Sequence, residues 1–315
     1  MKEIGGYFEL EKFKEKPYYE NVISLNTARN ALLYICEARK IKRVYLPYYL
    51  CDSVVNTLML KKIDYCFYHI DKNLMPILNF KINENEVVYL VNYFGQISNK
   101  TLLDIMCNVP QVILDNTHAF FQQPLKDVDT IYSCRKFFGV PDGAYLFTNC
   151  YLERKLKIDK SKGRMEHLLG RFEGNASEYY ECFHTNEESL EKEYLKKMSN
   201  LTKNILGAID YENVIKIRNE NYMYLKSVLD KKNLIETNII SGAFCYPFYC
   251  ENGLSLRKEL SKKKIFIPIL WPNVLNSCSM GTVEYQIASN ILPIPCDQRY
   301  GINEMKFIIN SLEKI

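Results

Sequence analysis

A lysine and an aspartate in one stretch of the chain have the surroundings needed for covalent chemistry on a carbonyl compound. Lys136 follows an apolar segment and precedes the turn Phe-Phe-Gly-Val-Pro-Asp-Gly. A desolvated lysine ammonium can lose its proton and attack a carbonyl carbon to form a Schiff base. Asp115 ends the apolar segment 112–114, and open α/β sheets place ligands at the carboxyl ends of their strands. A carboxylate at such a strand end can keep a ring nitrogen protonated, which turns the ring into an electron sink.

A lysine, an acidic ring partner and a phosphate site are together the requirements of pyridoxal 5'-phosphate. Ser133, three residues before the lysine, offers a hydroxyl group to a phosphate. Thr27, Ala28 and Arg29 open a segment with helical apolar spacing, and the free N–H groups of a helix N-terminus bind anions. These residues therefore predict a pyridoxal-phosphate site. Three plainer interpretations stay open: Lys136 as a solvated surface residue, Asp115 as a helix cap and Ser133 as a turn residue.

Other common ways of holding a cofactor or activating a nucleophile are missing. The chain has no GxGxxG, GxxxxGK[ST], GxSxG or HExxH motif, so nicotinamide, P-loop, hydrolase and zinc-protease signatures are absent. Its eleven cysteines form no CxxC pair, and the four histidines do not cluster with them. We expect free, mostly buried thiols and no metal site.

The elements that must position these residues alternate between strand-like and helix-like segments through the first half. Such alternation is typical of a mainly parallel α/β sheet flanked by helices. The pattern predicts helices over residues 28–39 and 52–61, and strands over residues 43–47, 65–70, 87–93, 112–114, 130–133 and 143–148.

The second half has a different character. Residues 152–206 are charged and helix-prone, and residues 201–229 predict one or two long helices. The pattern then predicts strands over 243–249 and 265–269, a helix between them over 254–263, and a final helix over 302–313. We therefore expect a large cofactor-binding domain over residues 1–210 and a smaller α/β domain over residues 211–315. Residues 1–20 are expected as a segment able to pack on the smaller domain.

Length, composition and charge limit the partners. The chain has 315 residues, of which 47% are apolar and 25% charged, with a net charge of +4, as in ordinary globular proteins. No block of like charge suggests nucleic-acid binding. The longest apolar run, 265–271, contains a proline and is far shorter than the ~20 residues that span a bilayer. The N-terminus has no secretory h-region, so we expect a cytoplasmic protein with no membrane or nucleic-acid partner.

The order of motifs resembles the DegT/DnrJ/EryC1/StrS family of fold-type-I, pyridoxal-phosphate-dependent sugar aminotransferases. Each motif is weak by itself, but their order covers most of the chain. The segments that carry the resemblance are LNTARNAL (25–32), VYLPYYLCDSV (44–54), FYHIDKNLMPI (67–77), VNYFGQ (91–96), LDNTHAFF (114–121), YSCRKFFGVPDGAYLFTN (132–149) and ILPIPCDQRYGINEMKFII (291–309).

The resemblance implies a fold-type-I transferase fold and a role for each matching residue. Lys136 would hold the cofactor and then move a proton, and Asp115 would contact the pyridine nitrogen. His118 would lie near the phenolic oxygen of the cofactor, although a core histidine is an equal alternative. The aromatic residue that stacks on the cofactor in this family aligns with Cys51, which leaves Tyr49 or Tyr48 as candidates for that role.

The resemblance also implies a substrate class. Lys197 replaces the arginine of the family's N-x-R-M segment, which reaches the partner subunit's site, and Arg299 could bind a substrate carboxylate or form a surface ion pair. The implied activity is amino transfer to a nucleotide-linked keto-sugar from an amino acid such as glutamate, in polysaccharide or amino-sugar biosynthesis. A homodimer with sites at its interface is implied as well. A lyase or dehydratase of the same fold and a non-catalytic binding protein are the alternatives.

Overall fold

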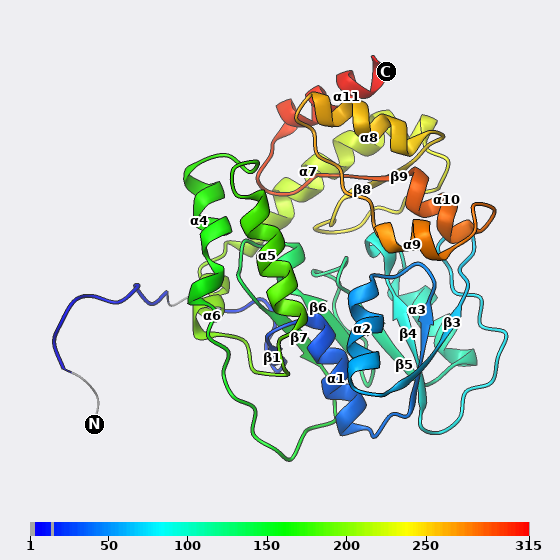
Figure 1. Cartoon of the computed structure of the whole chain (residues 1–315). Coiled ribbons are helices and arrows are strands. Elements are labelled where there is room, and N and C mark those ends of the chain that lie inside the picture. The colour runs from blue at the N-terminus through cyan, green and yellow to red at the C-terminus, as the bar shows by residue number, and fades with distance from the viewer. Residues whose placement is uncertain (1–3, 14–15, 315) are drawn as a thin grey trace.

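A seven-stranded, mostly parallel sheet forms the centre of the computed structural model, which describes residues 4–13 and 16–314 (Figure 1). The strand order is β1-β7-β6-β5-β4-β2-β3. The pairs from β3 through β2, β4 and β5 to β6 are parallel, whereas β7 runs antiparallel to both β6 and β1. The strand bounds are β1 Ile23–Leu25, β2 Arg43–Pro47, β3 Asp64–Tyr68, β4 Glu86–Val91, β5 Val112–Asp115, β6 Asp129–Ser133 and β7 Ala144–Phe147.

The three central strands end at the same edge of the sheet. Every residue of β4, β5 and β6 is buried, as expected of parallel strands covered on both faces. Asp115 pairs with Val91 of β4 and with Ile131 of β6. The residues that follow these strands therefore come together at the carboxyl edge.

Helices cover the sheet and build the rest of the molecule. Thr27, Ser98 and Ser199 cap the helices that follow them by accepting hydrogen bonds from backbone N–H groups, the common role of a hydroxyl at an N-cap. The helices are α1 Ala28–Ala38, α2 Asp52–Leu60, α3 Asn99–Asn108, α4 Glu166–Glu173, α5 Tyr180–Glu191, α6 Asn200–Leu206, α7 Tyr211–Leu229, α8 Gly253–Lys262, α9 Pro272–Ser277, α10 Val283–Asn290 and α11 Ile302–Glu313.

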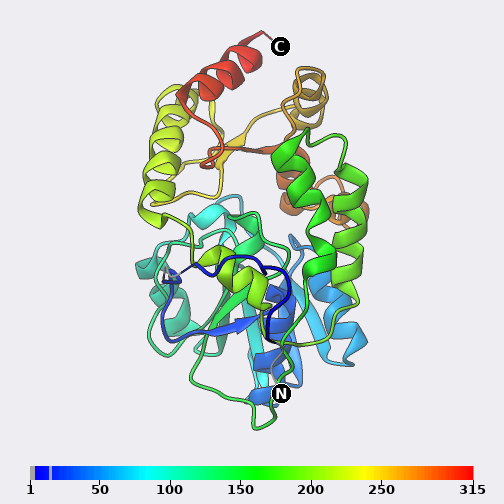
Figure 2. The ribbon, with the colours of Figure 1, turned by 90° about the vertical axis from the view of Figure 1, so that its left-hand side faces the viewer.

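A second, smaller sheet lies at the other end of the molecule. Its strands, β8 Tyr246–Tyr249 and β9 Ile291–Ile294, are antiparallel. Residues of these strands and of α7, α8 and α11 share a hydrophobic core that is separate from the core of the large sheet. Figure 2 shows this group above the large sheet, with α4 and α5 standing to one side.

Most of the predicted elements are present, and the mainly parallel α/β fold is confirmed. One strand prediction is wrong, because residues 265–269 form no strand. Pro268 cannot donate a ladder hydrogen bond, and the side chain of Phe266 is exposed. The partner of β8 is instead β9. The domain bounds at residues 210 and 211 stay a prediction. Two helices from the C-terminal third, α9 and α10, contribute Val274 and Ala288 to the core of the large sheet.

The packing of the N-terminal segment stays a prediction, whereas one further expectation differs from the structure. Residues 1–3 and 14–15 of that segment lie outside the described residues. The ring of Tyr19 packs against Phe120 and Tyr132, and the ring of Tyr18 lies 5.2 Å from that of Tyr211. All eleven cysteines are free, but only four of them are buried, so the thiols are not mostly buried. No helix among the described residues is long and apolar enough to span a membrane.

Candidate functional site

The carboxyl edge of the large sheet brings Lys136, Asp115 and His118 together. Asp115 ends β5, His118 lies in the turn after it, and Lys136 ends the short 3₁₀ helix Cys134–Lys136 that follows β6. The three groups are close enough for the charge of Lys136 to affect the pKa of both Asp115 and His118. Arg29, at the start of α1, and Cys51, just before α2, affect the pKa of Lys136 in turn.

The loop that carries Lys136 is fixed at Asp142 and Gly143. The fully buried Asp142 carboxylate accepts hydrogen bonds from the N–H and hydroxyl groups of Ser199, at 2.9 and 2.7 Å, and from the hydroxyl group of Thr202. Gly143 has a φ of 119°, and a Cβ there would lie 2.9 Å from Thr202 Cγ2. Glycine is therefore required at this position, and the loop is anchored on the N-terminus of α6.

The environment of Lys136 lowers the pKa of its amine. Its side chain is accessible to solvent, yet the surrounding protein removes enough water to lower its pKa. The positive charges of Arg135 and Arg29 act in the same direction, whereas Cys51 and Asp115 oppose it. A lysine that loses its proton more readily than usual is suited to attack a carbonyl carbon.

Asp115 is held in place by two neighbours. Its Oδ1 accepts a hydrogen bond from the Thr117 N–H at 2.8 Å, and its Oδ2 accepts one from the Tyr89 hydroxyl at 2.8 Å. Burial raises the pKa of this carboxyl group, and the hydrogen bonds partly offset that rise. A carboxylate has about four lone-pair positions, so Asp115 keeps the capacity to accept a bond from a ring N–H.

His118 presents an unsatisfied polar atom at this edge. Its Nδ1 faces the Phe94 N–H at 3.5 Å, and its Nε2 is buried without a hydrogen-bond partner among the described residues. Its ring lies parallel to Phe244, with centroids 4.3 Å apart, and to Trp271 at 5.7 Å. Buried polar groups normally have a partner. The free Nε2 therefore fits a ligand with a polar atom beside the ring, as pyridoxal phosphate has.

The predicted phosphate residues lie at the N-terminus of α1 and the end of β6. Thr27 Oγ1 caps the helix by accepting the Asn30 N–H, and Ala28 occupies the first helical position, where a backbone N–H has no partner within the helix. Ser133 is buried at the end of β6. Arg29 is 13% exposed at its side chain and lies 3.8 Å from Glu191. The chain therefore offers N–H donors and a cation to a phosphate group, which fits the predicted cofactor.

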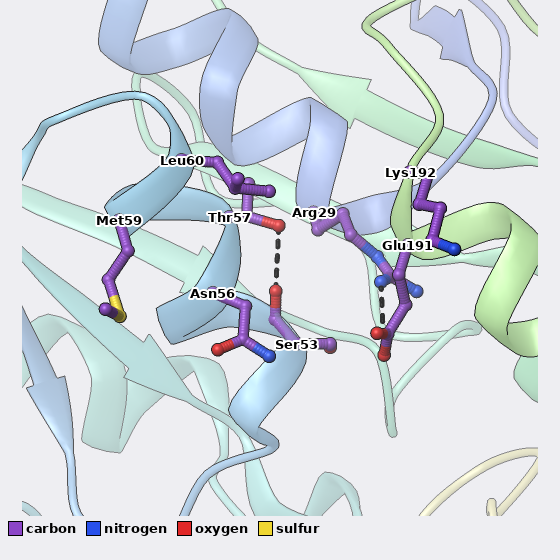
Figure 3. A pocket seen from close by; sticks show the side chains of 8 residues that line it. All are labelled: Arg29, Ser53, Asn56, Thr57, Met59, Leu60, Glu191 and Lys192. Atoms are coloured by element: carbon purple, nitrogen blue, oxygen red, sulfur yellow. Dashed lines mark hydrogen bonds and ion pairs between the residues drawn. The ribbon is translucent and has the colours of Figure 1, made fainter.

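Acidic residues of α5 contact both arginines near Lys136. Glu187 forms an ion pair with Arg135, and Glu191 with Arg29. Burial lowers the pKa of Arg135 to about 10, so these pairs compensate cations that are partly removed from water. A pocket of about 330 Å³ opens beside Arg29 between α2 and α5, and Figure 3 shows the Arg29 and Glu191 side chains directed toward each other there.

Three other predicted residues have contacts that do not test their predicted roles. Tyr49 is buried, and its ring contacts that of Tyr93 and that of Trp271, which in turn lies parallel to His118. The backbone of Lys197 forms bridges to residues 25 and 158, and its side chain is exposed. Arg299 forms an ion pair with Asp297 through two contacts, at 2.7 and 2.9 Å. The roles of Tyr49, Lys197 and Arg299 stay predictions.

Several residues of the site were missed by sequence reasoning. Phe244 and Trp271 come from the C-terminal half and flank His118, and Tyr89 supports Asp115 from within β4. Of these residues, only Trp271 stands out in the sequence, because it is the single tryptophan of the chain. The pairs of α5 with the arginines have none, because contacts between distant segments leave no local pattern.

The buried histidine predicts a dependence of stability on pH. Burial and the charge of Lys136 lower the pKa of His118 from 6.5 to about 3. Between these values the unfolded chain binds a proton at this position that the folded chain does not, so stability is lost as the pH falls from about 6.5 toward 3. In the parent, we expect this effect to lower the free energy of unfolding by on the order of a few kcal/mol over this pH range. His118→Gln should not show this decrease. Urea unfolding of both proteins at pH 7, 6, 5 and 4 measures it. Equal dependence on pH in the two proteins would contradict the prediction.

Solved sugar aminotransferases have the same fold as this chain. One is a DegT DnrJ EryC1 StrS aminotransferase from Brucella abortus, with 15% identity and a TM-score of 0.61 over 94% of this chain and 86% of that one. Another is the sugar aminotransferase CalS13 from Micromonospora echinospora, with 11% identity and a TM-score of 0.64 over 93% and 87%. A third is S. venezuelae DesV, with 13% identity and a TM-score of 0.62 over 94% and 84%.

These comparisons confirm the predicted fold class and, at the level of fold, the resemblance to the DegT/DnrJ/EryC1/StrS aminotransferases. No protein-family model matches the chain, and no curated protein matches it in sequence. The chain thus has the fold of the fold-type-I transferases, although its sequence identity to the solved examples is low.

Proposed function

We propose that this chain is a pyridoxal-phosphate-dependent aminotransferase. The observation that carries the proposal is the placement of Lys136, Asp115 and His118 at one edge of a fold-type-I sheet, with the pKa of the lysine lowered. Solved neighbours of the same fold include Spr1654 from Streptococcus pneumoniae in its PLP form and NtdA from Bacillus subtilis with the bound cofactor PMP. That support is independent of the motif order in the sequence.

Each residue of the site has a defined task in this activity. When bound, pyridoxal phosphate would supply an electrophilic aldehyde carbon and a ring that accepts electrons. Lys136 Nζ would attach the cofactor and move a proton as a general acid and base. Asp115 would hold a proton at the ring nitrogen, and His118 Nε2 would offer a hydrogen-bonding atom to a polar substituent of the ring. The N–H groups at the start of α1, with Ser133 and Arg29, bind the phosphate.

The finer assignment concerns the substrates and the assembly. The acceptor is a keto-sugar linked to a nucleotide, and the donor an amino acid such as glutamate, as in polysaccharide or amino-sugar biosynthesis. The motif order and the fold shared with sugar aminotransferases support it. Lys197 and Arg299 are proposed substrate contacts, and Tyr49 a support of the cofactor ring. We place the protein in the cytoplasm as a homodimer with sites at its interface; exposed apolar side chains on α4 and α5, such as Phe172 and Tyr180, favour a contact there.

Incubation with glutamate and a panel of nucleotide-linked keto-sugars tests the assignment. We expect the visible absorbance of the loaded protein to change on addition of glutamate, and an amino-sugar to form, detected by mass spectrometry. A yellow protein that responds to no amino donor would indicate lyase or dehydratase chemistry. A colourless protein that does not take up pyridoxal phosphate would indicate a binding protein and would overturn the proposal.

The phosphate site predicts a difference between two substitutions at one position. Ala28→Pro removes a free backbone N–H, whereas Ala28→Ser keeps it, and proline is tolerated in the first helical turn. We expect Ala28→Pro to weaken cofactor binding far more than Ala28→Ser. Ser133→Ala should weaken binding by about 1.5–3 kcal/mol, through loss of one hydrogen bond to a charged group. Absorbance titration at fixed pH and salt measures both, with circular dichroism as the control for folding. Equal affinity of Ala28→Pro and the parent would place the phosphate elsewhere.

A further inference from the structure

A buried arginine with no carboxylate partner lies next to the lysine segment. Arg218, in the middle of α7, is 1% exposed and forms no ion pair with any residue that the structure describes. The carboxylate of Asp297, whose charge affects the pKa of Arg218, forms an ion pair with Arg299. Burial lowers the pKa of Arg218. Burying a cation costs free energy unless its N–H groups are hydrogen-bonded. The groups that accept hydrogen bonds from Arg218 therefore indicate its role in the structure.

The first set of acceptors fixes the peptide between Phe137 and Phe138, one residue beyond Lys136. The Arg218 Nε–H donates to Gln298 Oε1 at 2.8 Å, and its Nη2 donates to the carbonyl oxygen of Phe137 at 3.3 Å. Gln298 Nε2 donates to the same carbonyl oxygen at 2.9 Å. The guanidinium also lies 4.6 Å from the centroid of the Phe137 ring. Arg218, Gln298 and Phe137 thus form a closed set of contacts, one residue beyond the lysine.

The remaining donor fixes the opposite side of the site. Arg218 Nη1 donates to the carbonyl oxygen of Ala243 at 2.7 Å. The next residue is Phe244, whose ring lies parallel to that of His118 at 4.3 Å. One guanidinium therefore contacts both the segment that carries the lysine and the segment that packs on the histidine.

We propose that Arg218 is a positioning residue, which holds the Phe137–Phe138 peptide and the segment before Phe244 in one fixed arrangement. The planar guanidinium donates to three acceptors in fixed directions, and a lysine ammonium cannot reproduce that geometry. Arg218 therefore sets the distance between the amine of Lys136 and the ring of His118. The proposal rests on the proposed function insofar as Lys136 and His118 are the groups that act on the cofactor.

The test compares two buried arginines. Arg218→Lys keeps the charge but loses the fixed geometry. Arg257→Lys is the matched control, because Arg257 is also buried and also donates to two backbone carbonyl oxygens, those of Ser289 and Ile291, which lie outside the lysine segment. Gln298→Glu is a second variant, which keeps an acceptor for Arg218 and removes the donor to Phe137.

Two readouts separate positioning from general stability. The first uses the cofactor-free protein: the rate at which acetic anhydride labels Lys136 at fixed pH, measured by mass spectrometry. We expect faster labelling in Arg218→Lys and Gln298→Glu, and the parent rate in Arg257→Lys. The second is the kinetics of the loaded enzyme, where we expect kcat to fall by about 10-fold or more with KM for the donor nearly unchanged, since small misplacements of reacting groups are costly.

The outcomes are distinct from those that test the proposed function. Labelling at the parent rate in both Arg218→Lys and Gln298→Glu, or equal changes in Arg257→Lys, would overturn the positioning role. If Arg218→Lys does not fold, Gln298→Glu decides. If the parent takes up no pyridoxal phosphate, the proposed function fails, yet the labelling rates of Lys136 still decide the role of Arg218.

Discussion

Replacing Lys136 with alanine is expected to abolish amino-group transfer while the protein stays folded. The side chain is accessible to solvent and forms no part of the hydrophobic cores, so its removal leaves no cavity. Its amine is the group proposed to attach the cofactor and to move a proton, and the other residues of the site cannot replace it in both steps. The rate of amino transfer from glutamate measures the loss, and circular dichroism measures the fold.

A second lysine provides the control for this experiment. Lys126 is exposed in the loop before β6, and Lys126→Ala should keep the activity of the parent. Parent activity in Lys136→Ala would show that another lysine carries the chemistry. Loss of the circular dichroism spectrum in that variant would instead assign a structural role to the side chain.

Asp115→Asn is expected to slow the half-reaction with the amino donor by on the order of 10²-fold or more, since each ~1.4 kcal/mol of barrier is a factor of ten. Asparagine has nearly the same shape, and its amide oxygen can accept a hydrogen bond from Tyr89 or Thr117. It carries no negative charge, however, and cannot keep a pyridine nitrogen protonated. The ring then accepts electrons less well when a proton leaves the substrate carbon.

Single-turnover absorbance measurements with glutamate test this expectation. Asp104→Asn, at an exposed position of α3, is the matched control and should react at the rate of the parent. Equal single-turnover rates for Asp115→Asn and the parent would show that Asp115 only supports the turn through its bond to the Thr117 N–H.

The fold was largely predictable because its central strands are continuous apolar runs. The strand at Arg43–Pro47 and the helix at Ile302–Glu313 have the predicted bounds, since a proline ends the first and a regular apolar spacing marks the second. The three-residue strand β1 was not predicted, because so short a segment at a sheet edge has almost no periodicity of its own. The error at 265–269 has a related cause: this run is apolar throughout, as in many buried strands, but strand pairing depends on the rest of the fold.

The candidate site was predictable where the residues follow strands. Asp115 and Ser133 end neighbouring parallel strands, so their proximity follows from the topology. The contacts of Phe244 with His118 and of Arg218 with Phe137 join segments that are far apart in the chain. No local spacing encodes such contacts, and tertiary packing alone decides them.

Reduction of the loaded protein with borohydride tests the central claim most directly. The protein is incubated with pyridoxal phosphate, reduced, digested and mapped by mass spectrometry. The proposed function predicts the reduced cofactor on Lys136, with no labelled peptide from Lys136→Ala. The reduced cofactor on a different lysine, or on none, would contradict the claim that this sheet edge is a pyridoxal-phosphate site.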